Sequence, residues 1–213
     1  MRGGSVISVF TPPATREAFA ASAAFFAARV AEVDGRWDEH GLGEWTVRDL
    51  VGHTSRSLLT IESYLRDEVE GHPEAASAAE YFDRAASSLA DPVAVTQRGR
   101  DAGAALGADP SAAVNDIRRR VTDLVDASPD DALVATPIGS MRLIDYLVAR
   151  TFELTVHTCD LCAALGLDAD VPPIAAAQTA ALIGELAARH QQVTALLLSA
   201  TGRGPLPPGF TVL

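Results

Sequence analysis

The chain has 213 residues, of which 48% are hydrophobic and 21% charged, so it is long enough to bury one core, and a single domain over 1–213 is expected. Its formal net charge of −11 argues against nucleic acids and anionic membrane surfaces as partners, because both attract basic proteins. Residues 1–9 lack the apolar region of a signal peptide, and no stretch approaches the roughly 20 apolar residues that span a bilayer. We therefore expect a cytoplasmic protein.

Two long helices are predicted in the first third of the chain. Thr11, followed by a proline, is a good N-cap for a helix over 13–33, whose aromatic and aliphatic residues recur at helical intervals. Thr46 is the expected N-cap of a second helix over 47–69. The segment 34–44 between them contains three glycines and predicts a loop.

The middle of the chain predicts shorter helices. Asp91 and Asp109 each precede a proline, which combines a capping side chain with a residue suited to the first helical turn. The segment 132–139 contains Thr136-Pro137-Ile138-Gly139 and favours an extended loop or a brief strand. The expected helices cover about 74–89, 92–106 and 111–125.

Two more long helices are predicted in the last third. Ser140 is the expected cap of a helix over 141–165, and Pro172-Pro173 opens a helix over 174–200. Abundant alanine and 6% aromatic residues favour closely packed helices. The predicted fold is all-α, an up-and-down four-helix bundle with extra short helices, in which the apolar last helix would allow a homodimer.

One polar stripe stands out on the helix predicted over 141–165. Arg150, Glu153, His157 and Asp160 fall within roughly 80° of one another around its axis. The same helix is rich in leucine, and ionisable groups on a packed helix must be paired or bound to a metal. Glu153 and His157 are four residues apart, a spacing at which two side chains on adjacent helical turns can bind one metal ion. His53 is the best candidate for a third ligand. A hydrogen-bonded Glu–His pair without an ion is the alternative.

The remaining histidines and the cysteines fit a metal site less well. His40 lies in the glycine-rich loop and His72 beside a helix end, and His190 lies in a polar run, where a solvated role is the simpler explanation. Cys159 and Cys162 form a C-x-x-C word inside a helix, on the side away from His157, and are expected to be structural thiols.

Three charged residues near the predicted ligands have two interpretations each. Asp160 could accept the second ring N–H of His157, or it could pair with Arg150 or with a neighbouring helix. Arg150 and Arg56 could bind an anionic substrate or form ordinary interhelical salt bridges. Trp45 is expected to be a packing residue.

Two sequence words carry a family resemblance, E-W-T-V-R-D-L-V-G-H at 44–53 and R-T-F-E-L-T-V-H-T-C-D-L at 150–161. They resemble the metal-binding domain of the mycothiol-dependent maleylpyruvate isomerase family, within the wider DinB-like group of four-helix bundles. The resemblance covers about 13–165. It implies that His53, Glu153 and His157 bind a divalent metal, with zinc the usual ion and nickel or another an alternative, and that the thiol cofactor is mycothiol.

The expected function follows from an open coordination position beside two histidines and one carboxylate. A thiol bound there would become a thiolate that attacks an electrophilic small molecule, as in a transferase or an isomerase. Maleylpyruvate isomerases of the family carry a further C-terminal domain, whereas one long helix and a short tail are expected here after Gly166, which favours a thiol transferase. A non-catalytic metal- or ligand-binding bundle, acting as a sensor or partner module, is the first alternative. A metal-assisted hydrolase is the second, but the H-E-x-x-H base is missing.

Overall fold

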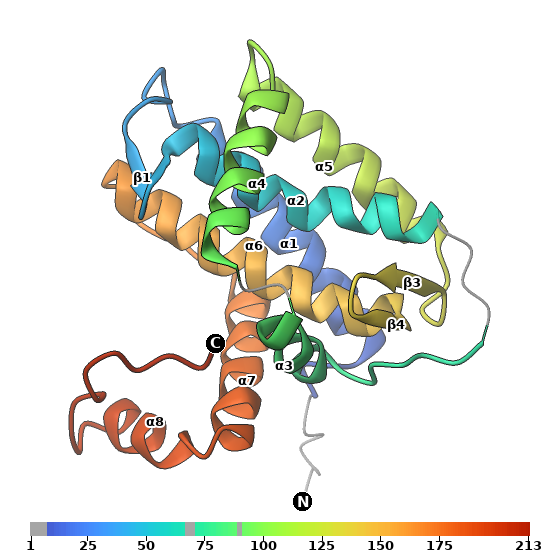
Figure 1. The fold of residues 1–213 in the computed structure, drawn as a ribbon, viewed down its shortest axis with the longest axis vertical. Coiled ribbons are helices and arrows are strands. Elements are labelled where there is room, and N and C mark those ends of the chain that lie inside the picture. Colours follow the sequence, from blue (N-terminus) through green and yellow to red (C-terminus); the bar gives the residue numbers. More distant parts are fainter. Residues whose placement is uncertain (1–7, 67–70, 89–90) are drawn as a thin grey trace, which may run out of the picture.

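The computed structural model describes residues 8–66, 71–88 and 91–213, and these fold mainly into helices (Figure 1). Two short antiparallel hairpins interrupt the helices. The helices are α1 Pro12–Val30, α2 Val47–Arg66, α3 Ala78–Ser88, α4 Pro92–Ala105, α5 Pro110–Ala127, α6 Leu143–Leu165, α7 Pro173–Arg189 and α8 Val193–Ala200. The strands are β1 His40–Leu42, β2 Trp45–Thr46, β3 Leu133–Thr136 and β4 Gly139–Arg142.

Capping side chains precede α1, α2, α4 and α5, as the sequence predicts. Thr11 caps α1, and Asp91 and Asp109 cap α4 and α5 by accepting backbone N–H bonds in the first turn. Before α2 the bonding is reciprocal. The Asp49 N–H donates to Thr46 Oγ1 at 3.2 Å, and the Thr46 N–H donates to Asp49 Oδ2 at 3.1 Å. This capping box satisfies two backbone donors that a helix start otherwise leaves unpaired.

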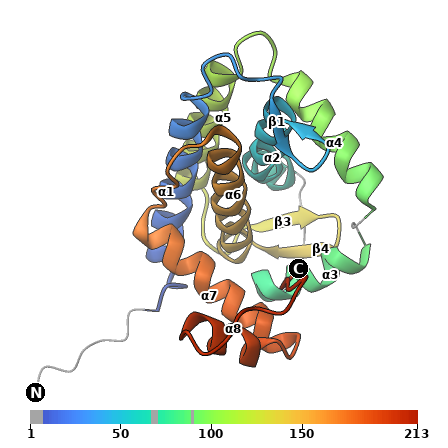
Figure 2. The same ribbon diagram turned by 90° about the vertical axis from the view of Figure 1, so that its left-hand side faces the viewer.

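Four helices form the bundle, and α6 contributes the largest share of its core. α1, α6, α2 and α5 pack against one another in a ring, with α4 outside on α2 and α7 across α1 and α6 (Figures 1 and 2). Leu143, Leu147, Leu154 and Leu161 of α6 are all buried. The all-α bundle is confirmed, but its fourth helix is α5 and not the segment 174–200. No helix in the described ranges is both long enough and apolar enough to cross a membrane.

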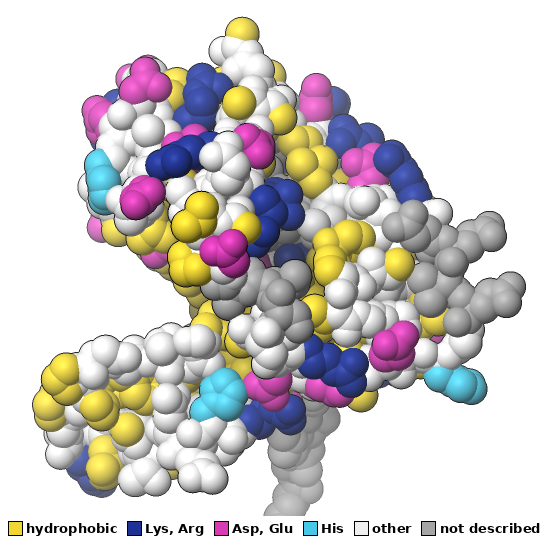
Figure 3. Space-filling model, in the orientation of Figure 1, with side chains coloured by type: hydrophobic (Ala, Val, Ile, Leu, Met, Phe, Trp, Pro, Cys, Tyr) yellow, Lys and Arg dark blue, Asp and Glu magenta, His cyan; other side chains and the backbone are white. Residues whose placement is uncertain are grey.

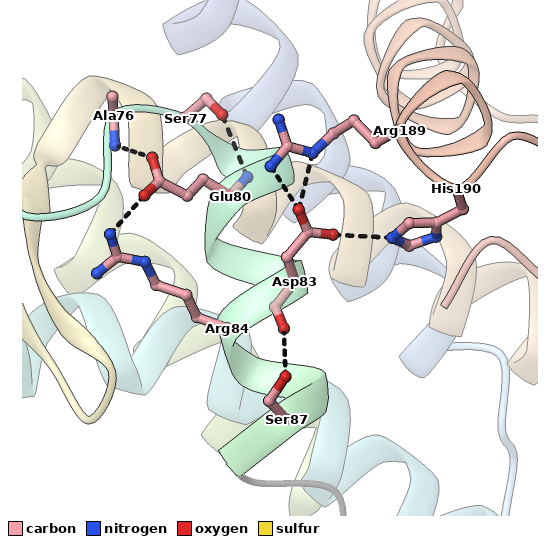
Figure 4. A network of polar contacts seen from close by, with 8 residues as sticks. All are labelled: Ala76, Ser77, Glu80, Asp83, Arg84, Ser87, Arg189 and His190. Atoms are coloured by element: carbon pink, nitrogen blue, oxygen red, sulfur yellow. Dashed lines mark hydrogen bonds and ion pairs between the residues drawn. The ribbon is translucent and has the colours of Figure 1, made fainter.

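The single helix predicted over 174–200 is wrong, because this segment forms two helices, α7 and α8. α7 ends at Arg189, and Gln191 has a positive φ of 60°, which turns the chain before α8. His190 is exposed, as expected, and its Nε2 lies 2.8 Å from Asp83 Oδ1, while Arg189 binds the other carboxylate oxygen (Figure 4). Asp83 is on α3, so this ion-pair network links α3 to the end of α7.

Hairpin contacts shift two predicted helix starts. Strand β4 includes Ser140, so Ser140 does not cap α6, which begins at Leu143. The Ser140 carbonyl accepts the N–H groups of Glu74 at 2.8 Å and Ala75 at 3.0 Å. These two donors are therefore engaged outside any helix, and α3 begins only at Ala78 instead of at 74.

The first hairpin lies in the predicted loop 34–44. β1 pairs with β2 in the register His40 to Thr46 and Leu42 to Trp45. This pairing folds the loop back over the start of α2, where the first sequence word begins. The predicted helix 13–33 ends earlier, at Val30. The expected ends of the helices over 47–69 and 74–89 include residues outside those described.

α2 and α4 approach each other at their glycines. A Cβ atom on Gly52 would overlap the backbone N and Cα of Gly103, and one on Gly99 would lie 2.5 Å from the Trp45 ring. The two helices can touch only because no side chain is present at these positions. This contact sets the position of α2 against α4 at Gly52, the residue before His53.

Candidate metal centre

His53, Glu153 and His157 meet between two bundle helices. α2 presents His53, and the neighbouring α6 presents Glu153 and His157 from successive turns. One ligating atom of each residue lies within 4.8 Å of those of the other two, and all three residues are partly buried. The tertiary fold thus brings together the three residues singled out in the sequence, although 100 positions separate His53 from Glu153.

Two carboxylates hold the ring of His157. Its Nδ1 lies 3.0 Å from Asp160 Oδ2, and its Nε2 lies 3.3 Å from Glu153 Oε2. Burial disfavours the charged imidazole, but the hydrogen bonds to Asp160 and Glu153 outweigh it and raise the pKa of His157 to about 9. Burial likewise disfavours the ionised Glu153, but the His157 hydrogen bond and nearby cations lower the pKa of Glu153 to about 2. Of the two roles predicted for Asp160, the structure therefore shows the contact with His157.

His53 has the opposite electrostatic character. Burial, followed by the charge of His157, lowers the pKa of His53 to about 4, so its ring is neutral. Its Nδ1 is buried and finds no hydrogen-bond partner among the residues that the structure describes. Its ring centre lies 4.8 Å from that of His157, with the planes at 89°. A buried, unpartnered imidazole nitrogen has an unfulfilled bonding capacity.

Trp45 covers the other side of His53. The two ring centres are 4.4 Å apart, with the planes tilted by 32°. The Trp45 ring is anchored by a 3.0 Å hydrogen bond from its Nε1 to the Thr96 carbonyl and by close contact with Gly99. Trp45 was predicted to be a packing residue, and it is buried, but its contact with His53 was missed. No periodicity links β2 to the second turn of α2, so the sequence carried no signal for this contact.

Arg150 is buried behind the three residues. Its guanidinium carbon lies 4.6 Å from the ring centre of Tyr146 and 5.2 Å from that of Tyr81. Its Nε has no hydrogen-bond partner in the described part of the chain, and no ion pair of Arg150 or Arg56 occurs there. The salt bridges that were the alternative interpretation for both arginines are therefore not formed between described residues.

The other candidates lie apart from this group. His40 and His72 are exposed, and neither belongs to the cluster. Cys162 is buried and Cys159 partly buried, and both are free thiols. Burial raises the pKa of each thiol, in line with the expected structural role.

The donor set matches what a divalent ion requires. Two imidazoles and one carboxylate are ligands typical of a zinc ion with an open position. Ligand bonds of about 2.1 Å in a tetrahedral site place donor atoms roughly 3.4 Å apart. The 3.3 Å between His157 Nε2 and Glu153 Oε2 has this spacing, and His53 has a buried ring nitrogen with no hydrogen-bond partner among the described residues.

One known family matches most of this chain. The family model described as the mycothiol maleylpyruvate isomerase N-terminal domain matches residues 19–162. The chain belongs to this family. The matched range includes both sequence words and all three residues of the cluster, whereas the mycothiol maleylpyruvate isomerase N-terminal domain model does not extend to α7 or α8. No curated protein and no solved structure matches the chain.

Proposed function

We propose that the chain is a divalent-metal-dependent enzyme that uses mycothiol as a transferase or in an isomerase-like reaction. His53, Glu153 and His157 hold the ion, zinc being the metal that this donor set favours. The observation that carries the proposal is the convergence of three ligating atoms within 4.8 Å, and one of the three residues is a partly buried histidine whose buried Nδ1 has no partner among the described residues. Mycothiol is proposed as the thiol because the description of the matched family names it.

Asp160 sets the orientation of one proposed ligand, and Arg150 favours the charged form of another. Asp160 holds the Nδ1 side of His157 and leaves Nε2 facing Glu153 and the centre of the cluster. The positive charge of Arg150 helps to keep Glu153 ionised, as a metal ligand must be. Trp45 limits the movement of the His53 ring. The protein therefore presents ligands whose orientation is set by neighbours on α6 and on strand β2, which leads into α2.

The chemistry at the site would be nucleophilic. A bound divalent cation stabilises a thiolate over a thiol, so it would supply the reactive form of mycothiol at neutral pH. The pKa of about 4 keeps His53 neutral and able to donate a lone pair. The small-molecule partner is an electrophile, attacked either to form an S-conjugate or to isomerise an activated double bond.

Metal analysis of two histidine variants tests the ligand set. His157→Ala removes one proposed ligand, while His72→Ala removes an exposed histidine that lies outside the cluster. We expect elemental analysis to find about one zinc per chain in the wild type and His72→Ala, and almost none in His157→Ala. Equal zinc content in the two variants would rule out the site, provided that circular dichroism shows both to be folded.

A second measurement separates the enzyme from a non-catalytic metal-binding bundle. The zinc-loaded protein is incubated with mycothiol and a small electrophile, and the loss of free thiol is followed. We expect consumption that depends on zinc and is lost in His157→Ala. Consumption no faster than in a protein-free control, with zinc bound, would favour the sensor or partner module.

A further inference from the structure

A hollow of about 400 Å³ lies where α7 crosses α1 and α6, next to the start of α3. It is separate from the candidate metal centre, because Ile144 and Val148 on its α6 wall point about 180° and 140° away from Glu153 around the helix axis. We name it the α7 hollow, and its walls include Phe10, Ala78, Ile144, Val148, Leu182 and Glu185.

The walls of the α7 hollow are mainly apolar. Ile144, Val148 and Leu182 are buried residues of α6 and α7, and the buried Ala78 forms the wall on the side of α3. Phe10 also lines the hollow and is 39% exposed. Sites for small molecules are typically cavities of about 300–1,000 Å³ with mostly apolar walls and a few polar groups. The α7 hollow has this size and this lining.

One carboxylate in the lining has no counter-ion. Asp145 is paired with Arg142, whose Nε and Nη2 donate to the two carboxylate oxygens at 2.6 and 3.0 Å. Glu185 is exposed and forms no ion pair with any described residue. Arg189, one turn further along α7, is bound to Asp83 instead. Glu185 therefore leaves the lining with one uncompensated negative charge.

A buried amide holds two walls of the α7 hollow together. Thr15 lines the hollow from α1 and accepts a 3.0 Å hydrogen bond from Gln178 Nε2 of α7. The same Nε2 donates to the Val9 carbonyl at 2.8 Å, so both of its hydrogens are used. Gln178 is fully buried, and its Oε1 has no partner among the described residues. The unpartnered polar groups at the hollow and behind its wall, the Glu185 carboxylate and this Oε1, are thus both hydrogen-bond acceptors.

We propose that the α7 hollow binds a small primary amine with an apolar body. The ammonium group pairs with the Glu185 carboxylate, and the apolar body packs against Ile144, Val148 and Leu182. An ammonium group has three N–H donors and no acceptor, so it suits a lining whose free polar group is a carboxylate. A carboxylic acid of the same size would be repelled by Glu185. Glu185 and Leu182 lie outside the matched range 19–162, and the site does not involve the metal centre.

Calorimetric titration of the full chain with 2-phenylethylamine tests the α7 hollow. Ionic strength is held constant with sodium chloride, because carboxylates are spread over the surface (Figure 3) and attract any cation weakly. Glu185→Gln keeps the shape of the side chain and is expected to weaken binding about fivefold. Glu17→Gln is the matched control, since Glu17 is exposed on α1, has no ion pair among the described residues and does not line the hollow. Its affinity for the amine should stay within about twofold of the wild type.

A second variant blocks the α7 hollow without changing its charge. Ala78→Leu places a larger side chain in the hollow from α3 and should weaken binding of the amine at least about tenfold. Circular dichroism checks that this variant is folded. Glu185 is exposed, so the charge test does not depend on a change in the core.

The outcomes separate this site from the candidate metal centre. Absence of 2-phenylethylamine binding by the wild type, or equal affinities in Glu185→Gln and Glu17→Gln, would overturn the proposal even if zinc binds as proposed. Equally tight binding of the neutral 2-phenylethanol or of the anion 3-phenylpropanoate would overturn the assignment to an amine. We expect His157→Ala to bind the amine as the wild type does, whereas loss of binding in that variant would move the amine to the metal centre and contradict the α7 hollow.

Discussion

Replacing Gly52 by alanine is expected to separate α2 from α4 and to displace the neighbouring His53. The new Cβ would overlap N and Cα of Gly103 and lie 2.6 Å from the carbonyl carbon of Ala102. All three are backbone atoms, so no side-chain rotation can relieve the overlap. Overpacking usually costs 1–3 kcal/mol, and a rigid backbone neighbour puts this site at the upper end, about 3 kcal/mol of unfolding free energy.

Urea unfolding followed by circular dichroism measures this loss, with Gly184→Ala as the control. Gly184 lies inside α7, and a Cβ there would meet no other atom within 4 Å. The same substitution should therefore stabilise the protein by about 0.5–1 kcal/mol through helix propensity. A Gly52→Ala variant whose unfolding free energy lies within about 0.5 kcal/mol of the wild type, or a Gly184→Ala variant less stable than Gly52→Ala, would contradict this packing of α2 on α4. Zinc titration of Gly52→Ala should also show weaker binding, because α2 carries His53.

Three further predictions follow from the contacts described. Zinc binding at neutral pH should release about one proton, because a pKa of about 9 keeps His157 protonated in the metal-free protein, and calorimetry in buffers of different ionisation enthalpy measures this. Trp45→Ala should lower the unfolding free energy by about 3–5 kcal/mol and weaken zinc binding, whereas unchanged zinc affinity would contradict the role of the stacked ring. Asp83→Asn should lower the melting temperature at neutral pH. Burial opposes the charge of Asp83, but Arg189 and His190 outweigh it and lower its pKa. The wild type's advantage should therefore be complete above the ordinary value of 3.8 and be lost as pH falls through the lowered pKa.

Local sequence patterns were sufficient for several features. The capping bonds at Thr46, Asp91 and Asp109 join residues no more than three positions apart, so the sequence around each cap contains all the atoms involved. The pairing of His157 with Glu153 and Asp160 is local in the same sense, because one helix places all three on adjacent turns. The family resemblance of the two sequence words agrees with the matched family.

Features that depend on distant partners could not be predicted in this way. α3 begins late because Ser140, more than 60 positions further on, accepts N–H bonds from Glu74 and Ala75. The ion pair of His190 needs Asp83 from α3, which is 107 positions away. The break between α7 and α8 also has only a weak local signal, since Gln191 is not a residue that usually takes a positive φ.

The sequence by itself determined where most helices begin and which face of α6 carries ionisable groups, because both follow from contacts within a helical turn. Only the tertiary structure decided that α5 completes the bundle and that α2 brings His53 to Glu153. It also decided that Trp45 covers the His53 ring. These arrangements depend on how closely helices pack, and the glycine contact between α2 and α4 becomes visible only once both helices are in place.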